Sequence, residues 1–373
     1  MNTFDGKRVF LVLGTSTGGV GAHVASIAEG LAAADARVTV CGPSATEELF
    51  GFTAKGARFV PVEISAGLDP VADARATRRL RKALRGPGGS IAADLVHAHG
   101  MRAGLVARAS RPVGVPLVVT WHNVLMAEGP KARILGAAET LVARGADLSL
   151  CVSDDLVTRV LKLGGQDVRF APIPAPFLPE TTRTADDVRA ELGDSDRRRP
   201  LILAIGRLHP QKGHAVLIDA AAALADRDPK PLFVIAGEGP QRAELAERVE
   251  RTGAPVRFLG HRADIADLLA AADIVASTSQ WEGYPLFAQE ALRSGTPLVA
   301  TRVGGVPAVV GEAASLVPPD DPEAVAEAIA KLLDDPEARE RLSKAGIDKA
   351  AGLPTVEDGM AQVRAVYREL TGA

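Results

Sequence analysis

Short β-rich runs alternate along this chain with stretches whose apolar residues recur at helical spacing. In the first half of the chain the short runs lie at residues 9–13, 38–41, 95–98, 117–120 and 148–152. Strands joined by helical crossovers run in the same direction, because each helix carries the chain back to the same edge of the sheet. The alternation therefore predicts an α/β fold with parallel sheets wrapped by helices.

A proline-rich segment interrupts this alternation at residues 171–179, where four of nine residues are proline. Prolines at that density favour an extended connector between domains. A second alternating series begins at Leu201, and 373 residues suffice for two domains that each bury a core. We expect an N-terminal domain over 1–177, a linker region over 178–199, a C-terminal domain over 200–355 and a last helix over 356–373.

Glu282 and Glu290, with seven residues between them, bracket a turn at which Pro285 suits the first position of a helix that Gly295 ends. The amide groups at the start of this helix are those of Tyr284, Leu286 and Phe287. Free amides there form a seat for a phosphate, and the two carboxylates can accept hydrogen bonds from sugar hydroxyls. An isolated pair of this kind is more often two solvated glutamates, so the neighbouring motifs decide.

A strand-to-helix loop at residues 206–213, Gly-Arg-Leu-His-Pro-Gln-Lys-Gly, follows a predicted strand at 201–205. It places Arg207 and Lys212 at the carboxyl end of that strand, where open α/β sheets bind ligands. A guanidinium and an ammonium there can neutralise a departing diphosphate. Either cation taken alone is more often a solvated surface residue.

Together these segments resemble the retaining nucleotide-sugar glycosyltransferases of family 4. The shared motifs lie at residues 206–213, 237–240 (Gly-Glu-Gly-Pro), 256–260 (Val-Arg-Phe-Leu-Gly), 282–290 and 295–305. The resemblance implies the GT-B architecture, in which two Rossmann-like domains face each other across a cleft. It further implies that the last helix packs back on the first domain, that the second domain binds the donor and that the first binds the acceptor.

The same resemblance assigns roles to individual side chains. Arg207 and Lys212 would hold the donor diphosphate, while Glu282 would bind the transferred sugar. The donor-binding residues around the predicted helix start would be Gly283, Tyr284, Pro285, Leu286 and Glu290, with Glu290 on the ribose. The loop over 258–262 would contribute to the base pocket.

The loop over residues 14–21 of the first domain, Gly-Thr-Ser-Thr-Gly-Gly-Val-Gly, joins the first predicted strand to a helix. Its glycines would let the backbone approach a ligand closely. The loop matches neither the Walker pattern nor G-x-G-x-x-G, and a tight turn explains it equally well. By the family resemblance, Gly18 and Gly19 face the diphosphate and the acceptor.

Three histidines are predicted to meet at one edge of the first sheet. His97 and His99 alternate onto one face of a strand, and His122 follows the next strand. A metal site is one interpretation, but no carboxylate pattern completes it, and a structural role is favoured for His97. His122 resembles the active-site histidine of the family, which would bind the sugar or shape the acceptor side.

Two Asp-x-Asp tripeptides, at residues 194–196 and 226–228, raise the question of a metal ion. Both lie in polar connectors, which favours solvated loops. We therefore predict no metal and no cofactor besides the nucleoside diphosphate sugar, with positive charge supplied by Arg207, Lys212 and the helix N-terminus.

Charge, cysteine content and the length of the apolar runs indicate which partners the protein can bind and in which cellular compartment it is expected. A net charge of -3 gives no argument for nucleic acid. Cys41 and Cys151 show no disulfide or metal spacing, and the apolar run at 9–13 is too short for a signal peptide or membrane span, so we expect a cytoplasmic protein. A basic helix over 71–85 carries Arg75, Arg78, Arg79, Lys82 and Arg85 on one face. A solvated helix is the favoured interpretation, and contact with anionic lipid at the inner face of the membrane is the alternative.

These inferences converge on an enzyme that moves a hexose-type sugar from a nucleoside diphosphate to an acceptor without metal. The family resemblance implies that the anomeric configuration is retained. Lipid-linked sugar, polysaccharide, cyclitol and secondary metabolite all stay open as acceptors. A nucleotide-sugar 2-epimerase of the same architecture and a non-catalytic sugar-nucleotide-binding protein are the alternative functions.

Overall fold

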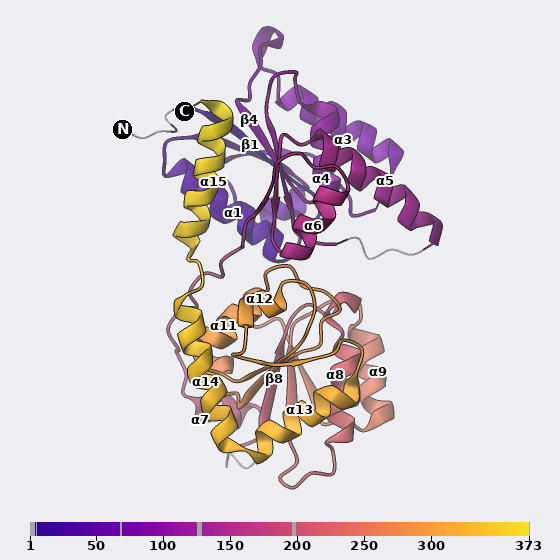
Figure 1. The fold of residues 1–373 in the computed structure, drawn as a ribbon, viewed down its shortest axis with the longest axis vertical. Helices are drawn as coiled ribbons and strands as arrows, with labels where there is room; N and C mark the ends of the chain where they lie inside the picture. The colour runs from indigo at the N-terminus through magenta and orange to yellow at the C-terminus, as the bar shows by residue number, and fades with distance from the viewer. Residues whose placement is uncertain (1–3, 5, 68, 125–128, 196–198, 373) are drawn as a thin grey trace. The chain divides into compact units, whose positions relative to one another are not determined.

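The computed structural model describes residues 4, 6–67, 69–124, 129–195 and 199–372, and it divides into two compact units. The first unit comprises Met1–Ile173 and Val356–Ala373, and the second comprises Pro174–Thr355. In each unit, helices cover both faces of a parallel sheet (Figure 1). The predicted α/β fold class is confirmed.

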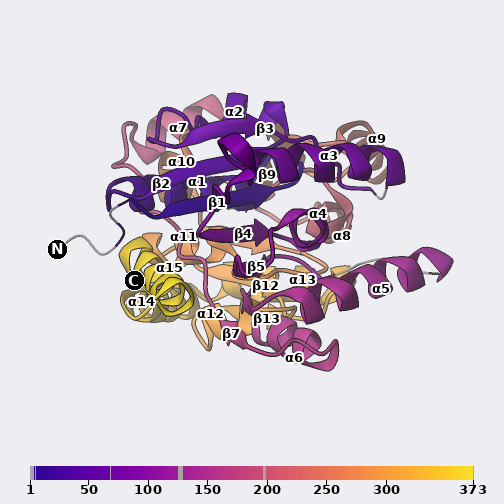
Figure 2. The same ribbon diagram turned by 90° about the horizontal axis from the view of Figure 1, so that it is seen from above.

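The sheet of the first unit has seven strands within the described residues, in the order β3-β2-β1-β4-β5-β6-β7 (Figure 2). They are β1 (Arg8–Leu13), β2 (Arg37–Gly42), β3 (Arg58–Pro61), β4 (Leu95–His99), β5 (Leu117–Trp121), β6 (Leu148–Cys151) and β7 (Val168–Phe170). The five predicted runs match β1, β2, β4, β5 and β6 to within one residue at each end. The edge strands β3 and β7 were missed because they are short and only partly buried.

Helices cover the two faces of this sheet in separate groups. One face carries α1 (Gly19–Ala32), α2 (Ser44–Phe50) and α15 (Val356–Thr371). The other carries α3 (Pro70–Ala83), α4 (Met101–Ser110), α5 (Gly129–Gly145) and α6 (Asp154–Lys162), with the 3-10 helix η1 (Pro87–Gly89) following α3.

The last helix, α15, belongs to the core of the first unit and lies beside α1 (Figure 1). Its buried side chains recur at helical spacing, at Met360, Val363, Val366 and Tyr367. Burial of each large apolar side chain contributes about 1.5–3 kcal/mol, so this stripe holds the helix to the sheet. Glu369 adds an ion pair with Arg169, with nitrogen and oxygen 2.7 Å apart.

The second unit contains a parallel sheet in the order β10-β9-β8-β11-β12-β13. Its strands are β8 (Leu201–Ile205), β9 (Leu232–Ala236), β10 (Val256–Gly260), β11 (Ile274–Ser277), β12 (Leu298–Thr301) and β13 (Ser315–Val317). One face carries α8 (His214–Ala223), α9 (Arg242–Thr252) and α13 (Pro322–Asp334). The other carries α7 (Ala185–Glu191), α10 (Ile265–Ala271), α11 (Leu286–Ser294), α12 (Val306–Val310) and α14 (Pro336–Ala351). Side chains of β8 alternate between the two cores, with Leu201 and Leu203 on one side and Ile202 and Ala204 on the other.

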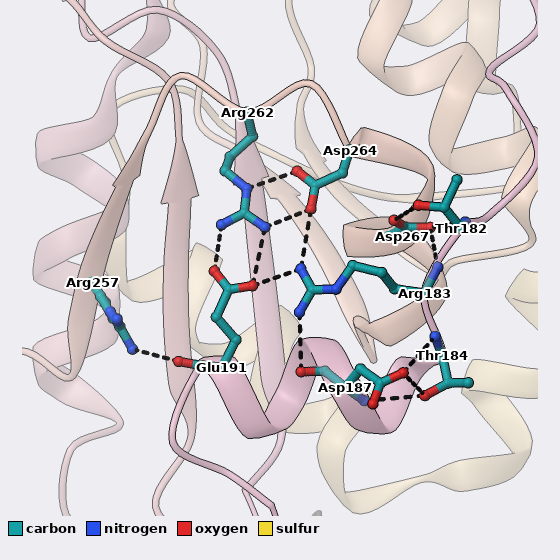
Figure 3. A network of polar contacts seen from close by, with 9 residues as sticks. All are labelled: Thr182, Arg183, Thr184, Asp187, Glu191, Arg257, Arg262, Asp264 and Asp267. Atoms are coloured by element: carbon teal, nitrogen blue, oxygen red, sulfur yellow. Dashed lines mark hydrogen bonds and ion pairs between the residues drawn. The ribbon is translucent and has the colours of Figure 1, made fainter.

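Residues 178–199, predicted as a linker region, differ from that expectation because they contain α7. Val188 and Leu192 are buried in the core of the second unit, so this helix is part of the unit. Thr184 and Asp187 cap the helix reciprocally, each side chain accepting from the backbone amide of the other (Figure 3). The capping residues Thr184 and Asp187 are present in the sequence, but the prolines before them favour an extended chain.

Candidate active site

The two candidate donor loops of the second unit meet at the carboxyl edge of its sheet. The loop after β8 ends in the 3-10 helix η2 (Pro210–Lys212), and Nζ of Lys212 lies 2.5 Å from Oε1 of Glu282, which follows β11. Ser279 donates a second hydrogen bond, of 2.6 Å, to the same carboxylate oxygen. Glu282 is only 7% exposed, and the ammonium lies 5.6 Å from the centroid of the Phe287 ring. A cation and a carboxylate are therefore fixed side by side in a largely buried corner.

Two glycines allow these loops to approach each other so closely. Gly213 follows Lys212 with φ +61°, and a Cβ there would lie 2.0 Å from the carbonyl oxygen of Thr278. Gly304, in the loop after β12, has φ +48°, and a Cβ there would lie 2.0 Å from the carbonyl oxygen of Glu282. Only glycine meets both the conformational and the steric requirement at these positions.

Arg207 is exposed at the carboxyl end of β8, two residues after the strand ends. Its carbonyl oxygen accepts a hydrogen bond of 3.2 Å from Nε2 of the buried His214, in the first turn of α8. Burial lowers the pKa of His214 to about 4, so this imidazole stays neutral at physiological pH. The backbone that carries Arg207 is thus anchored at the carboxyl end of β8.

Helix α11 carries the second predicted carboxylate, Glu290, one turn beyond its first residue, Leu286. Burial raises the pKa of Glu290, and the positive charge of Arg293 opposes that rise. Pro285 was predicted to be the first helical residue, but its ψ of 120° places it before the helix as the N-cap. The first helical amides are therefore those of Leu286 and Phe287, without Tyr284.

The remaining residues of the predicted donor set lie around this helix start. Gly283 and Pro285 are buried, whereas Tyr284 and Leu286 are partly exposed. Burial also raises the pKa of the Tyr284 hydroxyl. Gly283, Pro285 and Leu286 lie on the same short segment as Glu282 and the first amides of α11.

The loop after β10, predicted to form part of a base pocket, is held through Arg262. Its guanidinium donates to Asp264 at 2.5 and 2.7 Å and to Glu191 of α7 at 2.6 Å (Figure 3). Arg183 contacts the same two carboxylates and so closes a ring of four alternating charges. Hydrogen bonds from Arg262 and Arg183 lower the pKa of Glu191 to about 2. The ring joins the loop to α7, a connection that the sequence did not reveal.

The glycine-rich loop of the first unit follows β1 and leads into α1. Gly18 precedes the helix, Gly19 is its first residue, and the side chain of Ser16 accepts a 3.0 Å hydrogen bond from the amide of Gly21. Gly19 is exposed and Gly18 is partly exposed. Both glycines therefore lie at the carboxyl edge of the first sheet, within reach of a ligand.

The predicted histidine cluster forms at the same edge, within the first unit. Nδ1 of His99 lies 3.1 Å from Nε2 of His122, and the ring of His97 lies 4.2 Å from that of His99. His97 is bonded at both nitrogens, to the hydroxyl groups of Tyr367 and Thr120, each at 2.6 Å, which makes it structural.

A fourth histidine, His23 of α1, was missed. Its ring lies 5.7 Å from the rings of both His99 and His122. His23 lies in the first turns of the helix that follows β1, and β1 is the neighbour of β4, which carries His97 and His99. That position in the sequence was the signal that could have predicted its place in the cluster. Burial lowers the pKa of all four imidazoles, to about 4 for His23, to about 3 for His97 and well below 6.5 for the other two.

Within the described ranges, no group of three or more histidine, cysteine or acidic side chains is arranged to hold a metal ion. Of the Asp-x-Asp tripeptides, Asp194 is buried in an ion pair with Arg189, and Asp196 lies outside the described residues. Asp226 and Asp228 are exposed.

The basic residues of α3 point away from the core of the first unit. Arg75, Arg78, Arg79, Lys82 and Arg85 are all exposed. Ala76 and Leu80, on the opposite side of the helix, and Leu84, which follows it, are buried. Over the part of the chain that the structure describes, no helix combines the length and apolar character needed to cross a membrane.

Comparison with known proteins identifies both halves of the chain. Residues 189–349 match the family described as glycosyl transferases group 1, and residues 18–176 match the glycosyl transferase 4-like domain. The D-inositol 3-phosphate glycosyltransferase of Corynebacterium efficiens is 31% identical over 76% of this chain and 73% of its own. The alpha-D-kanosaminyltransferase of Streptomyces kanamyceticus is 31% identical over 74% of this chain and 77% of its own.

Solved structures agree with this assignment at the level of the fold. Anabaena HepE, solved in complex with UDP-glucose, superimposes with a TM-score of 0.81 at 22% identity, over 97% of this chain and 99% of that one. A sucrose-phosphate synthase from Thermosynechococcus elongatus gives a TM-score of 0.78 at 22% identity, over 98% and 99%. The GT-B fold class that the motifs implied is thereby confirmed.

Proposed function

The chain belongs to the family 4 glycosyltransferases of GT-B fold, and from that premise we propose that its donor is a nucleoside diphosphate sugar. The transferred group is a hexose-type sugar, which passes to an acceptor hydroxyl with retained anomeric configuration. No metal ion takes part, because cationic side chains and helix amides supply the positive charge.

The observation that carries this proposal is the 2.5 Å pair between Lys212 and Glu282 beside the start of α11. Diphosphates require positive charge and N–H donors, whereas sugar hydroxyls require a carboxylate acceptor. A cation, N–H donors and a carboxylate acceptor lie next to each other here. They are on loops at the carboxyl edge of a parallel sheet, where such folds bind ligands. A sugar joined to a diphosphate needs that juxtaposition.

In the reaction we propose, the bond between the anomeric carbon and the diphosphate oxygen breaks and leaves its electron pair on the diphosphate. Lys212, Arg207 and the amides of α11 stabilise that negative charge, each side chain by about 3 kcal/mol. Glu282 accepts hydrogen bonds from the sugar, and Glu290 accepts them from the ribose. The acceptor oxygen then bonds to the carbocation-like sugar on the same face, and its proton passes to the departing diphosphate.

We assign acceptor binding to the first unit, through the backbone at Gly18 and Gly19 and the ring of His122. Support comes from their shared position at the carboxyl edge of the first sheet, where parallel α/β sheets bind ligands. One relative is named for D-inositol 3-phosphate, so cyclitol phosphates are the first acceptor class to test. Lipid-linked sugars, polysaccharides and secondary metabolites follow.

For the basic face of α3 we propose a solvated surface and no lipid contact. Its cations are exposed without a neighbouring aromatic anchor on the helix, while Leu80 packs inward. Flotation with vesicles of anionic lipid should leave the protein unbound. Binding that is lost when Arg78, Arg79 and Lys82 are replaced by glutamate would overturn this point.

The deciding experiment is a thermal-shift panel of UDP, GDP, ADP and their common sugar conjugates in the presence of EDTA. One conjugate should stabilise the wild type and the Lys344→Ala control, which alters an exposed lysine of the same unit, but not Lys212→Ala. The stabilising conjugate is then incubated with each acceptor class, and the anomeric configuration of the product is read by NMR. Stabilisation by none of them would overturn the donor assignment, and an epimerised donor without any acceptor would favour the 2-epimerase.

A further inference from the structure

His99 is buried, yet one of its two ring nitrogens has no hydrogen-bond partner in the described part of the chain. The side chain is 3% exposed, Nδ1 lies 3.1 Å from Nε2 of His122, and Nε2 is the unpartnered atom. His122 is the less buried member of the pair, at 6% exposed. None of the hydrogen bonds among the described residues uses its Nδ1.

Two arrangements of protons fit a hydrogen bond between these neutral rings. If His99 donates from Nδ1, its Nε2 carries only a lone pair, and the proton of His122 is on the outer nitrogen, Nδ1. If His122 donates from Nε2, the proton of His99 is on Nε2, where a buried N–H finds no acceptor. Orphaned buried donors are rarer in proteins than under-used acceptors, because the donor loses its bond to water entirely. The cost of leaving the His99 N–H without an acceptor outweighs the weak preference of a solvated histidine for a proton on Nε2.

We propose that His99 is a positioning residue that fixes the tautomer of His122, so that His122 presents Nδ1–H to an oxygen of the acceptor. The inference rests on the proposed function for the identity of that oxygen, but the tautomer does not depend on it. The low pKa of both imidazoles keeps them neutral, as the arrangement requires. His122 then acts as a hydrogen-bond donor and takes no proton from the acceptor.

The primary test is the ring tautomer of His122 in the wild type, read from long-range 1H–15N NMR correlations of the ligand-free protein. Nδ1 should show the shift of a protonated nitrogen, and Nε2 that of a bare nitrogen. A proton on Nε2 overturns the proposal. Because no substrate is present, this result stands even if the protein transfers no sugar, in which case only the proposed function fails.

Two variants of similar shape separate the hydrogen bond from the space that the ring fills. His99→Asn keeps an N–H near Nδ1, whereas His99→Leu lacks any donor. Asn should retain the His122 tautomer and turnover within about threefold, whereas Leu should mix the tautomers and lower kcat about tenfold with an unchanged KM for the donor. Equal losses of turnover in both variants, with folding verified by circular dichroism, would reduce His99 to a packing role and contradict the proposal.

Discussion

Lys212 and Glu282 lie 70 residues apart in the sequence, yet their ammonium and carboxylate groups are 2.5 Å apart. The pair ties the loop after β8 to the loop after β11, and Gly213 and Gly304 make room for the contact. An ammonium has three N–H donors, so Lys212 can bind a phosphate without releasing Glu282. Under the proposed function, Glu282 orients Lys212 toward the donor and also offers a hydrogen-bond acceptor to the sugar.

Replacing Lys212 by alanine removes the cation that is proposed to stabilise the departing diphosphate. A loss of about 3 kcal/mol in the transition state lowers turnover by more than about 100-fold. Steady-state sugar transfer, measured with the donor found in the thermal-shift panel, should show this loss in Lys212→Ala and not in Lys344→Ala. Full activity in Lys212→Ala would refute the assignment.

Glu290→Gln should make the protein more stable and should weaken binding of the donor. Burial raises the pKa of this carboxyl, so the folded state disfavours the charged form, and its unfavourable contribution grows as the pH rises through that pKa. The glutamine variant should therefore gain melting temperature, more at pH 8 than at pH 5. Loss of the charged acceptor should raise the KM for the donor at the same time. A lower melting temperature at pH 8 would contradict this reading of the site.

Most of the fold followed from the sequence because its signals are local. Short runs such as 9–13 and 95–98 favour buried strands and form β1 and β4, and Gly295 ends α11 in the left-handed conformation expected of a helix C-terminus. Helix α7 was overlooked because its capping pattern is weaker than the proline signal before it. Pro285 was misplaced by one position because proline fits both the N-cap and the first helical position.

The contacts within the sites were harder to predict, because they join distant segments. Arg207, Lys212 and Glu282 were recognisable by motif, but the direct pairing of Lys212 with Glu282 depends on how two loops pack. The bonds of Arg262 to Glu191 likewise require that α7 lie against the loop after β10. His23 reaches His99 and His122 only because β1 and β4 are adjacent, which strand order alone decides.

Gly304→Ala should destabilise the protein and displace Glu282. The added Cβ would meet the carbonyl oxygen of Glu282 at 2.0 Å, in addition to the strain of φ +48°. Gly253→Ala is the matched control, because that glycine has φ +66° but nothing within 4 Å of the added atom. Both variants incur about 1 kcal/mol of backbone strain.

The steric term should appear only at Gly304. Urea unfolding should therefore show a larger loss of the free energy of unfolding in Gly304→Ala than in Gly253→Ala, by at least about 1 kcal/mol. Donor binding, measured by calorimetry, should weaken only in Gly304→Ala. Equal losses in the two variants would mean that the loop carrying Glu282 shifts to make room for the added Cβ without lowering the free energy of unfolding.

The four histidines of the first unit should make the protein acid-labile. Burial lowers their pKa, to about 4 for His23 and about 3 for His97, whereas an unfolded chain protonates them near pH 6.5. Between these values the unfolded state binds more protons. The free energy of unfolding is therefore highest above about pH 6.5 and falls as the pH drops. The slope is about 1.4 kcal/mol per pH unit for each histidine that is protonated in the unfolded chain and neutral in the folded protein.

His23→Phe isolates one of these contributions, because it keeps an aromatic ring against His99 and His122 and removes a titrating nitrogen pair. Urea unfolding followed from pH 7.5 to pH 4.5 gives the proton uptake on unfolding as the slope of free energy against pH. The variant should take up about one proton fewer than the wild type between pH 6 and pH 4.5. An unchanged slope would show that the His23 imidazole accepts a proton in the folded protein, and that the cluster is open enough to water to bear the charge.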